Sequence, residues 1–338
     1  MDSLEELRGK RVVVAGIGGG GDALGALVFY HKLKAMGAEP LLASVVWERF
    51  VLDPFPGPIP LEQLRNAEHI SSASALVTKD SYVDRFGYLV RPQIVRAAQV
   101  LDQKAVFLDL SKGYEGLREA FESLASLGAD FILGVDVGGD VIAKGCEDDL
   151  WSPLADAVSL SALRHSSLPS AVVVFSPGAD GELSPAAVLE RVSKIAGKGG
   201  LVGAYGLNRR EYWALKPYLE AFVSEASKIP FEAFSGRWGE KRIRGGTRGV
   251  ELSPLATVAF VLDTAIAYEE NELAKLVQGT RKITEARERL NRRCVYTELD
   301  LEEDLYRVKQ SESPLSLHEL KGEGRRRLLL SGCSPLLC

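Results

Sequence analysis

The chain lacks a long apolar run, a closely spaced cysteine pair and an excess of positive charge. No apolar stretch in its 338 residues approaches the ~20 residues that a membrane helix requires. The four cysteines, Cys146, Cys294, Cys333 and Cys338, include no C-x-x-C pair, so we expect neither a zinc site nor a disulfide framework. The formal net charge of -5 disfavours nucleic acids and membranes as partners. We therefore expect a cytoplasmic protein.

Two common catalytic signals are also missing. None of the four histidines falls in the motifs described below, and no G-x-S-x-G turn occurs. Their absence disfavours hydrolysis by a serine and histidine pair. The 46% of hydrophobic residues, beside 26% of charged residues, nevertheless supplies enough apolar material for a large core.

Short β-branched runs alternate with amphipathic stretches over the first 206 residues. Strands are predicted at 11–17, 40–46, 104–110, 130–137, 170–176 and 200–206, and helices at 22–36, 91–102, 114–128, 153–164 and 184–200. Four prolines and a glycine within 53–60 predict a loop. This alternation predicts an α/β fold with an open, mainly parallel, doubly wound sheet of the Rossmann-like kind.

The pattern becomes helical beyond about residue 208. Helices are predicted at 210–228, 262–275 and 278–292, with a polar Gly/Arg-rich segment at 236–249. We interpret these residues as a helical C-terminal elaboration of one α/β domain that spans 1–310. The tail at 311–338 loses periodicity and is expected to be poorly ordered or docked on the domain.

A glycine-rich turn between the first predicted strand and helix is the strongest chemical signal. Gly18, Gly19, Gly20 and Gly21 precede Asp22. Residues without Cβ let backbone N–H groups approach a ligand, and a helix N-terminus favours negative charge. The turn therefore predicts a binding site for a phosphate or carboxylate. The alternative is that Asp22 only caps the helix while the glycines pack it against the strand.

A second turn rich in glycine and aspartate follows the strand at 130–137. It contains Asp136, Gly138, Gly139 and Asp140. Ligands of open α/β sheets lie beyond the carboxyl ends of the strands, so both turns are expected to face one cleft. Three carboxylates beside an anion site need a cation or a sugar hydroxyl between them, which predicts Mg²⁺ or Mn²⁺ held by Asp22, Asp136 and Asp140. The alternative is that Asp136 only accepts amide hydrogen bonds in its turn.

Further polar residues are candidates for the same rim. Ser152 and Asp156 stand near the start of the helix at 153–164, and Asp180 and Glu182 follow the strand at 170–176. We assign these four residues to ligand binding. The alternative is an ordinary turn at Asp180 and a charged helix start at Glu182.

A basic segment offers groups that bind anions. Arg242 and Arg244 lie among glycines in 236–249, and Glu225 and Ser227 precede this segment. Arginines on a flexible frame bind phosphate through two hydrogen bonds, and such a loop could close over the cleft. We assign Arg242 and Arg244 to catalysis, and Glu225 and Ser227 to ligand binding. A solvated turn or hairpin is the alternative.

Several motifs together resemble one known family. They are GIGGGGDALGAL, WERFVLDPFPGP, GVDVGGDVIAKGCEDDLWSPLADA, GADGELSPAAVLERV, SEASKIPFEAFSGRWGEKRIRGGTRGVELSP and TELD, in order from about residue 11 to 303. The chain resembles the mainly archaeal domain-of-unknown-function family 1152. The resemblance implies a shared architecture and signature positions, and no activity, substrate or cofactor. The tail beyond about residue 310 departs from the family pattern.

These features lead to one main functional hypothesis. The chain is predicted to be a metal-assisted hydrolase or phosphotransferase for a phosphorylated or nucleotide-like small molecule. The glycine turn holds the anion, while Asp22, Asp136 and Asp140 organise the ion or act as a base. Arg242 and Arg244 neutralise developing charge.

Other classes of function remain open. One is a sensor that binds a nucleotide or metabolite without turnover, and another is a Rossmann-type dinucleotide-binding protein, although the turn matches the G-x-G-x-x-G fingerprint only loosely. An RNA-associated role would rely on the basic segment and on Arg325, Arg326 and Arg327, against the acidic total charge. The sequence leaves open whether the protein forms a homo-oligomer.

Overall fold

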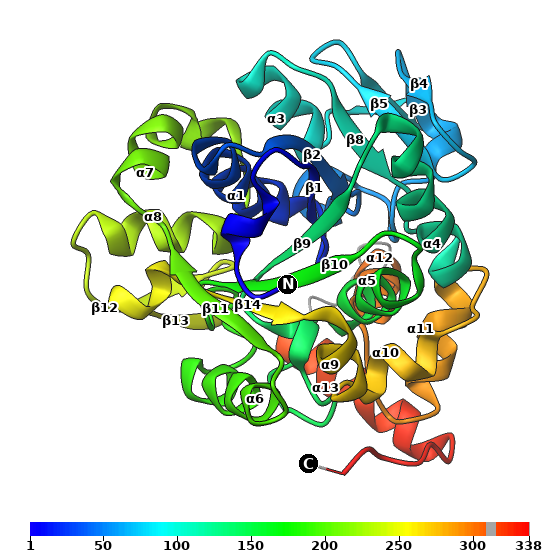
Figure 1. Ribbon diagram of the computed structural model, residues 1–338. Helices are drawn as coiled ribbons and strands as arrows, with labels where there is room; N and C mark the ends of the chain where they lie inside the picture. Colours follow the sequence, from blue (N-terminus) through cyan, green and yellow to red (C-terminus); the bar gives the residue numbers. More distant parts are fainter. Residues whose placement is uncertain (309–315, 338) are drawn as a thin grey trace.

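The computed structural model describes residues 1–308 and 316–337, and it has an α/β architecture built on one large mixed sheet (Figure 1). The order of the nine strands is β11-β14-β10-β9-β1-β2-β8-β5-β4. Five central neighbours run parallel: β1 (Arg11–Gly16), β2 (Glu39–Val45), β8 (Ala105–Leu108), β9 (Phe131–Val137) and β10 (Ser170–Phe175). Each begins and ends within two residues of the range predicted for it. The mainly parallel α/β sheet is thus confirmed.

The order of the parallel strands reverses once. The chain moves outward from β1 to β2 and β8, and then returns to place β9 and β10 on the other side of β1. Connections leaving β1 and β9 therefore lead to opposite faces of the sheet, to α1 (Ala23–Met36) and α5 (Pro153–His165) respectively. A crevice opens between such diverging connections at the carboxyl ends of the strands.

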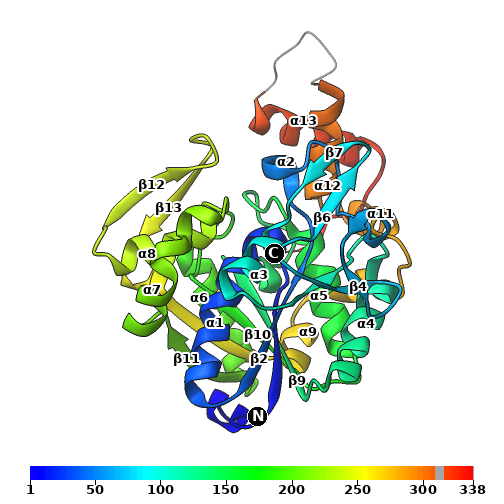
Figure 2. The ribbon, with the colours of Figure 1, turned by 90° about the horizontal axis from the view of Figure 1, so that it is seen from above.

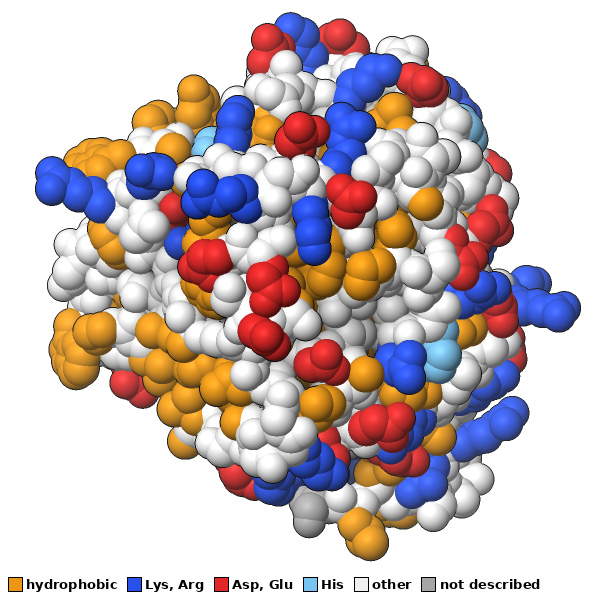
Figure 3. Space-filling view, viewed as in Figure 1, with side chains coloured by type: hydrophobic (Ala, Val, Ile, Leu, Met, Phe, Trp, Pro, Cys, Tyr) orange, Lys and Arg blue, Asp and Glu red, His pale blue; other side chains and the backbone are white. Residues whose placement is uncertain are grey.

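Antiparallel strands complete both edges of the sheet. They are β14 (Val258–Asp263) with β11 (Leu201–Gly206) on one side, and β5 (Ser74–Val77) with β4 (Glu68–His69) on the other. Strand β11 is an outer strand with partly exposed residues, and Figure 3 shows apolar side chains gathered in the region of β11 and α6 (Pro185–Gly197).

Helices cover both faces of the sheet and bury two apolar clusters. One cluster includes residues of α1, α3 (Gln93–Leu101), α7 (Arg209–Leu215) and α8 (Ile229–Phe234). The other draws on α4 (Gly113–Ser123), α5, α6, α9 (Thr264–Glu269), α10 (Glu272–Val277) and α11 (Ile283–Asn291). Two helix starts that the sequence marks by a serine before proline, at Ser152 and Ser184, are present, and the Ser184 side chain accepts the Ala187 N–H.

The predicted helix at 262–275 is wrong at its start. Residues 258–263 instead form β14, because their apolar and β-branched side chains fit between β10 and β11. Asp263 then begins α9 by accepting the Ile266 N–H, and Asn271 begins α10 by accepting the Ala274 N–H. Two caps eight residues apart divide the predicted helix into two short ones.

The predicted helix at 210–228 is also shorter than expected. Helix α7 ends at Leu215, and Pro217 allows only a 3₁₀ segment after it, because proline lacks the N–H that a helix interior needs. The segment at 236–249 is a hairpin rather than a loop, with β12 (Gly239–Ile243) paired to β13 (Arg248–Leu252). The hairpin was the alternative interpretation of its sequence.

Residues 61–90, for which the sequence predicted no elements, hold short strands. Besides β4 and β5 they form a small sheet of β3 (Leu64–Arg65), β6 (Tyr82–Arg85) and β7 (Tyr88–Val90). Figure 2 shows this sheet near α2 (Arg49–Leu52) and α12 (Glu298–Val308). Strands of two to four residues carry too little periodicity to be found in a sequence.

The C-terminal region is attached to the domain by a helix and a disulfide. Helix α13 (Leu317–Leu330) begins with a capping box at Ser316, and Lys321 donates a hydrogen bond to the Asp148 carbonyl at 2.8 Å. Cys294 and Cys333 form a disulfide with 5.3 Å between their Cα atoms, which corrects the expectation drawn from cysteine spacing. Residues 311–315 and 338 of the predicted tail lie outside the described residues.

No helix within the described ranges combines the length and apolar character needed to cross a membrane.

The contact between α1 and the sheet gives a test of the core. Phe29 and Phe175 are fully buried, and their rings meet edge to face with centroids 5.7 Å apart. Phe175→Ala should lower the free energy of unfolding by about 3–5 kcal/mol in urea denaturation, because it leaves a cavity. Phe86→Ala is the matched control, since that ring is 76% exposed. Equal effects of both substitutions would contradict this packing.

Candidate functional site

A cavity of about 620 Å³ lies at the carboxyl ends of β1, β9 and β10. The turns after these strands line it, together with the tip of the β12–β13 hairpin and the helices α2 and α12. Among the lining residues that the structure describes, ten are acidic and three are arginines. The cavity therefore concentrates negative charge where the strand order reverses.

The glycine-rich turn is packed closely against carboxylates. Gly18 N–H donates to Asp22 Oδ2 at 2.7 Å, and a Cβ on Gly18 would lie 2.7 Å from that oxygen and 2.9 Å from Asp156 Oδ1. A Cβ on Gly20 would lie 2.5 Å from Glu48 Oε1. The missing side chains thus make room for three acidic groups. Asp22 stands at the N-cap of α1, but its side chain makes no capping hydrogen bond.

Three carboxylates converge on one point. Ligand oxygens of Asp140, Asp180 and Glu182 all lie within 4.8 Å of one another, and the three side chains are buried. Asp140 Oδ1 is shielded from solvent and has no hydrogen-bond partner among the described residues, and the same holds for Asp156 Oδ1. Such unpartnered buried oxygens are rare because a lost hydrogen bond is costly.

Several carboxyl groups in this cavity have raised pKa values. Burial raises the pKa of Asp22 to about 7, although the hydrogen bond from Gly18 opposes this shift. Burial raises the pKa of Asp180 to about 6, and the nearby Glu182 charge adds to it. Burial and the negative charges of the other members raise the pKa of Asp136 and Asp156 well above the usual range. Asp136 Oδ2 also accepts the Val141 N–H at 3.2 Å. This bond agrees with the alternative prediction that Asp136 accepts amide hydrogen bonds in its turn.

Glu182 is the ionised member of this group. Burial raises its pKa, but the Arg248 guanidinium 2.6 Å away and hydrogen bonds from Ser152 and Trp151 outweigh burial and hold the pKa at about 2. Its Oε2 accepts the N–H groups of Trp151 and Ser152 at 2.6 and 2.7 Å, just before α5. Arg248 thus neutralises one carboxylate of the cluster.

Arg244 is a cation with no ion pair among the described residues. Its Nε is shielded from solvent and has no hydrogen-bond partner there either, and the residue lies at the hairpin tip with φ of 55°. Burial lowers the pKa of the Arg244 guanidinium, and the positive charges of Arg248 and Arg49 add to this shift. Glu225 holds the backbone in place by accepting the Arg244 N–H at 2.8 Å. The arrangement leaves the guanidinium available to an anion.

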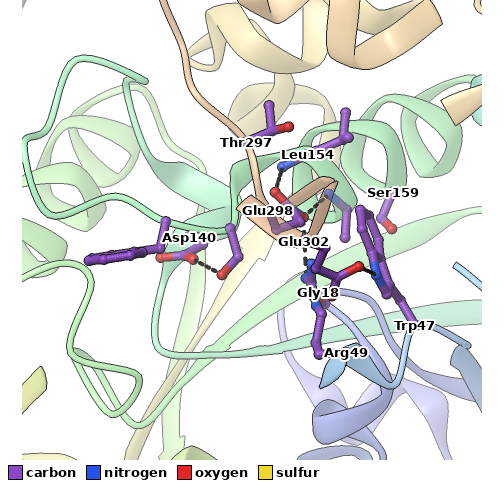
Figure 4. Close-up of polar contacts among 12 residues, drawn as sticks. Gly18, Trp47, Arg49, Asp140, Leu154, Ser159, Thr297, Glu298 and Glu302 are labelled. Atoms are coloured by element: carbon purple, nitrogen blue, oxygen red, sulfur yellow. Dashed lines mark hydrogen bonds and ion pairs between the residues drawn. The ribbon is translucent and has the colours of Figure 1, made fainter. Parts of the chain in front are cut away.

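A third arginine ties the C-terminal region to the glycine turn (Figure 4). Arg49 lies over the Trp47 ring, 4.1 Å from its centroid, and donates to Gly18 O at 3.3 Å and to Glu298 Oε1 at 3.2 Å. Glu298 also accepts the N–H groups of Leu154 and Ala155 at 3.0 and 2.9 Å. Two acidic residues, Glu182 and Glu298, therefore bind the free amides around the start of α5.

The structure brings together most of the residues selected from the sequence. Thirteen of them line the cavity: Gly18, Gly19, Gly20, Gly21, Asp22, Asp136, Asp140, Ser152, Asp156, Asp180, Glu182, Glu225 and Arg244. The acidic trio differs from the predicted metal set, because it joins Asp140 to Asp180 and Glu182 rather than to Asp22 and Asp136.

Four selected residues are not among those that line the cavity. A Cβ on Gly138, which precedes Gly139 in this turn, would lie 2.2 Å from Asp180 Oδ2. The absence of a side chain at Gly138 therefore leaves room for the Asp180 carboxylate. Ser227 Oγ donates to Gly21 O at 2.8 Å. The Arg242 side chain is 65% exposed and lies 3.4 Å from Glu240. Of the two arginines assigned to catalysis, only Arg244 reaches the cavity.

Sequence reasoning assigned no chemistry to several lining residues. They are Glu48, Arg49, Glu298 and Glu302. Glu48 and Arg49 belong to the WERF motif, and Glu298 belongs to the TELD motif, both of which carried the family resemblance. Their position in those motifs was the available signal. Their distance from the glycine turn in the chain concealed the contact.

The fold and this cavity define a class: an α/β protein with a buried carboxylate and arginine centre at the carboxyl edge of a mostly parallel sheet. Residues 13–306 match the family described as "Protein of unknown function (DUF1152)", and the chain belongs to that family. No curated protein and no solved structure matches it significantly.

Glu302 gives a test of the charge balance at the cavity wall. Burial raises its pKa from 4.5 to about 7 in the folded protein, although the Arg49 charge opposes this. Its Oε2 accepts the Trp47 Nε1–H at 2.9 Å and the Gly57 N–H at 2.8 Å, contacts that a glutamine oxygen reproduces. Because the unfolded chain releases this proton first, Glu302 should destabilise the fold as pH rises from about 4.5 to 7.

The variant Glu302→Gln should therefore match the wild type at pH 4, below the unfolded pKa, and exceed its free energy of unfolding at pH 8 by on the order of 1–3 kcal/mol. Urea denaturation at the two pH values measures this difference. A variant that is less stable than the wild type at both pH values would show that the ionised carboxylate stabilises the fold instead.

Proposed function

We propose that the protein is a metal-assisted enzyme that hydrolyses or transfers a phosphoryl group of a small molecule bound in this cavity. The observation that carries the proposal is the presence of an unpartnered carboxyl oxygen and an unpaired guanidinium in one cavity. Asp140 has a buried, unpartnered oxygen, and Arg244 has no ion pair among the described residues. A divalent cation with a phosphate on it would satisfy both.

The acidic trio has the chemistry that a divalent cation requires. Asp140, Asp180 and Glu182 offer carboxylate oxygens within 4.8 Å of one another, and Mg²⁺ and Mn²⁺ prefer such ligands. Arg248 pairs with only one of the three, so Asp140 and Asp180 form no ion pair among the described residues. Bound here, Mg²⁺ or Mn²⁺ would polarise a phosphoryl oxygen and acidify a water molecule.

The groups on the other sides of the cavity complete the proposed roles. Arg244 would bind the anion and neutralise charge that develops on it. Asp22, whose pKa is raised to about 7, is suited to exchange a proton near neutral pH, and Asp136, whose pKa is also raised, lies in the same cavity. The amides of the glycine turn would add hydrogen bonds to the anion.

A dinucleotide-binding protein is the second candidate. The parallel strands follow the doubly wound order of Rossmann-like folds, and Glu48 lies just after β2, where such folds bind a ribose hydroxyl. Glu48 Oε2 is buried and unpartnered, which favours such a bond. Its contact with Gly20 weighs against this reading, because a pyrophosphate at the glycine turn would meet the carboxylate. A sensor without turnover is the third candidate.

Calorimetric titration tests the two charges separately. Mn²⁺ should bind the wild type, and inorganic pyrophosphate should bind more tightly when Mn²⁺ is present. Asp140→Asn should weaken Mn²⁺ binding at least about tenfold, because it removes a charged ligand. Arg244→Ala should weaken pyrophosphate binding about ten- to a hundredfold with Mn²⁺ affinity retained. Arg242→Ala is the matched control and should weaken pyrophosphate binding less than Arg244→Ala does, because the Arg242 side chain is exposed.

Turnover separates the enzyme from the sensor. Phosphate release from a panel of phosphate esters and diphosphates should require Mg²⁺ or Mn²⁺ and should be lost in Asp140→Asn. Ligands that bind but stay intact during long incubation would favour the sensor. Absence of Mn²⁺ binding at any pH from 6 to 9 would contradict the metal site itself.

A further inference from the structure

The cavity is divided into a charged floor and an apolar rim, and helix α12 contributes to both. Glu298, Leu301, Glu302 and Leu305 all line the cavity, at the spacing i, i+3, i+4 and i+7 that places them on one face of the helix. Glu298 and Glu302 are buried, whereas Leu301 and Leu305 are half-buried. The acidic residues of this face are therefore its buried members, and the leucines are its more exposed members.

Other segments extend the apolar part of the wall. Figure 2 shows α2 beside α12, and the hairpin β12–β13 on the other side of the molecule. Partly exposed apolar side chains from three segments outside α12 line the cavity; they are Phe50, Val51, Val223 and Leu317. We call these four residues together with Leu301 and Leu305 the apolar rim. Val51 is 49% and Val223 is 37% exposed, so these parts of the rim are accessible to water.

We propose that the substrate is an anionic amphiphile, an organic phosphate whose hydrocarbon group lies against the apolar rim while its phosphate lies on the charged floor. The inference rests on the proposed function, because the floor is the proposed cation and anion site. Covering the rim by a hydrocarbon would remove its apolar surface from water, which is favourable. The cavity volume of about 620 Å³ accommodates such a ligand.

The polar groups near the rim favour a hydrocarbon over a nucleobase. Gln93 Oε1 accepts the Val223 N–H at 3.0 Å, and Ser224 Oγ donates to Ser227 Oγ at 2.9 Å. Thr247 Oγ1 donates to the Arg244 carbonyl at 2.8 Å. These side chains already hold protein partners, so they are poorly placed to recognise the edge of a base. Five of the six rim residues are aliphatic, and Phe50 is the one aromatic ring among them.

Titration of a chain-length series tests the proposal. The probes are inorganic phosphate and butyl, hexyl and octyl phosphate, each added to the protein with saturating Mn²⁺ in a calorimeter. Affinity should rise about two- to fourfold for each added methylene until the rim is covered. Leu301→Ser and Leu305→Ser should remove most of this gain and leave the affinity for inorganic phosphate unchanged.

A matched leucine controls for general effects of the substitution. Leu201 starts the outer strand β11, is not among the residues that line the cavity and is 39% exposed, so Leu201→Ser should retain the full gain with chain length. Thermal unfolding of each variant checks that the fold persists, as expected for half-buried positions.

The possible results separate this inference from the proposed function. The amphiphilic substrate is contradicted if inorganic phosphate binds with Mn²⁺ but affinity does not rise along the alkyl series. It is also contradicted if a nucleoside monophosphate binds more tightly than octyl phosphate. In both cases the proposed cation site is retained. If neither phosphate nor any alkyl phosphate binds with Mn²⁺, both proposals fail.

Discussion

Burying many carboxylates at one end of a sheet is the constraint on which the rest of this structure depends. An isolated buried charge costs several kcal/mol, and the cavity has ten acidic side chains against three arginines among the described residues. The protein meets this constraint in three ways. Arg248 neutralises Glu182, backbone amides around the start of α5 bind Glu182 and Glu298, and burial raises the pKa of several remaining groups.

The glycine turn is a consequence of the same constraint. Gly18 and Gly20 lie where a Cβ would collide with the carboxylates of Asp22, Asp156 and Glu48. Interpreted from the sequence alone, four glycines in a row indicated an approach of the backbone to a bound anion. In the folded chain they also allow the acidic side chains of Asp22, Asp156 and Glu48 to approach the end of β1. Both roles require the absence of side chains at these positions.

The C-terminal residues form part of the cavity wall. Glu298 and Glu302 on α12 join Arg49, Trp47 and the start of α5, and Leu301 and Leu305 continue the same face into the rim. The disulfide between Cys294 and Cys333 and the contact of Lys321 with Asp148 connect the region around α12 and α13 to the domain. The charged floor and the apolar rim thus consist of residues that lie up to nearly 300 positions apart in the chain.

The sequence by itself determined the βα order, the ends of the parallel strands and the two turns rich in glycine and aspartate, because hydrophobic periodicity, helix caps and glycine runs are local properties. Only the tertiary structure decided which carboxylates meet. Asp140 joins Asp180 and Glu182 instead of Asp22 and Asp136, and Arg244 reaches the cavity while Arg242 does not. Strand β14 and the roles of Glu48, Arg49 and Glu298 were likewise invisible, because they depend on pairing and contacts between segments far apart in the chain, which no local pattern records.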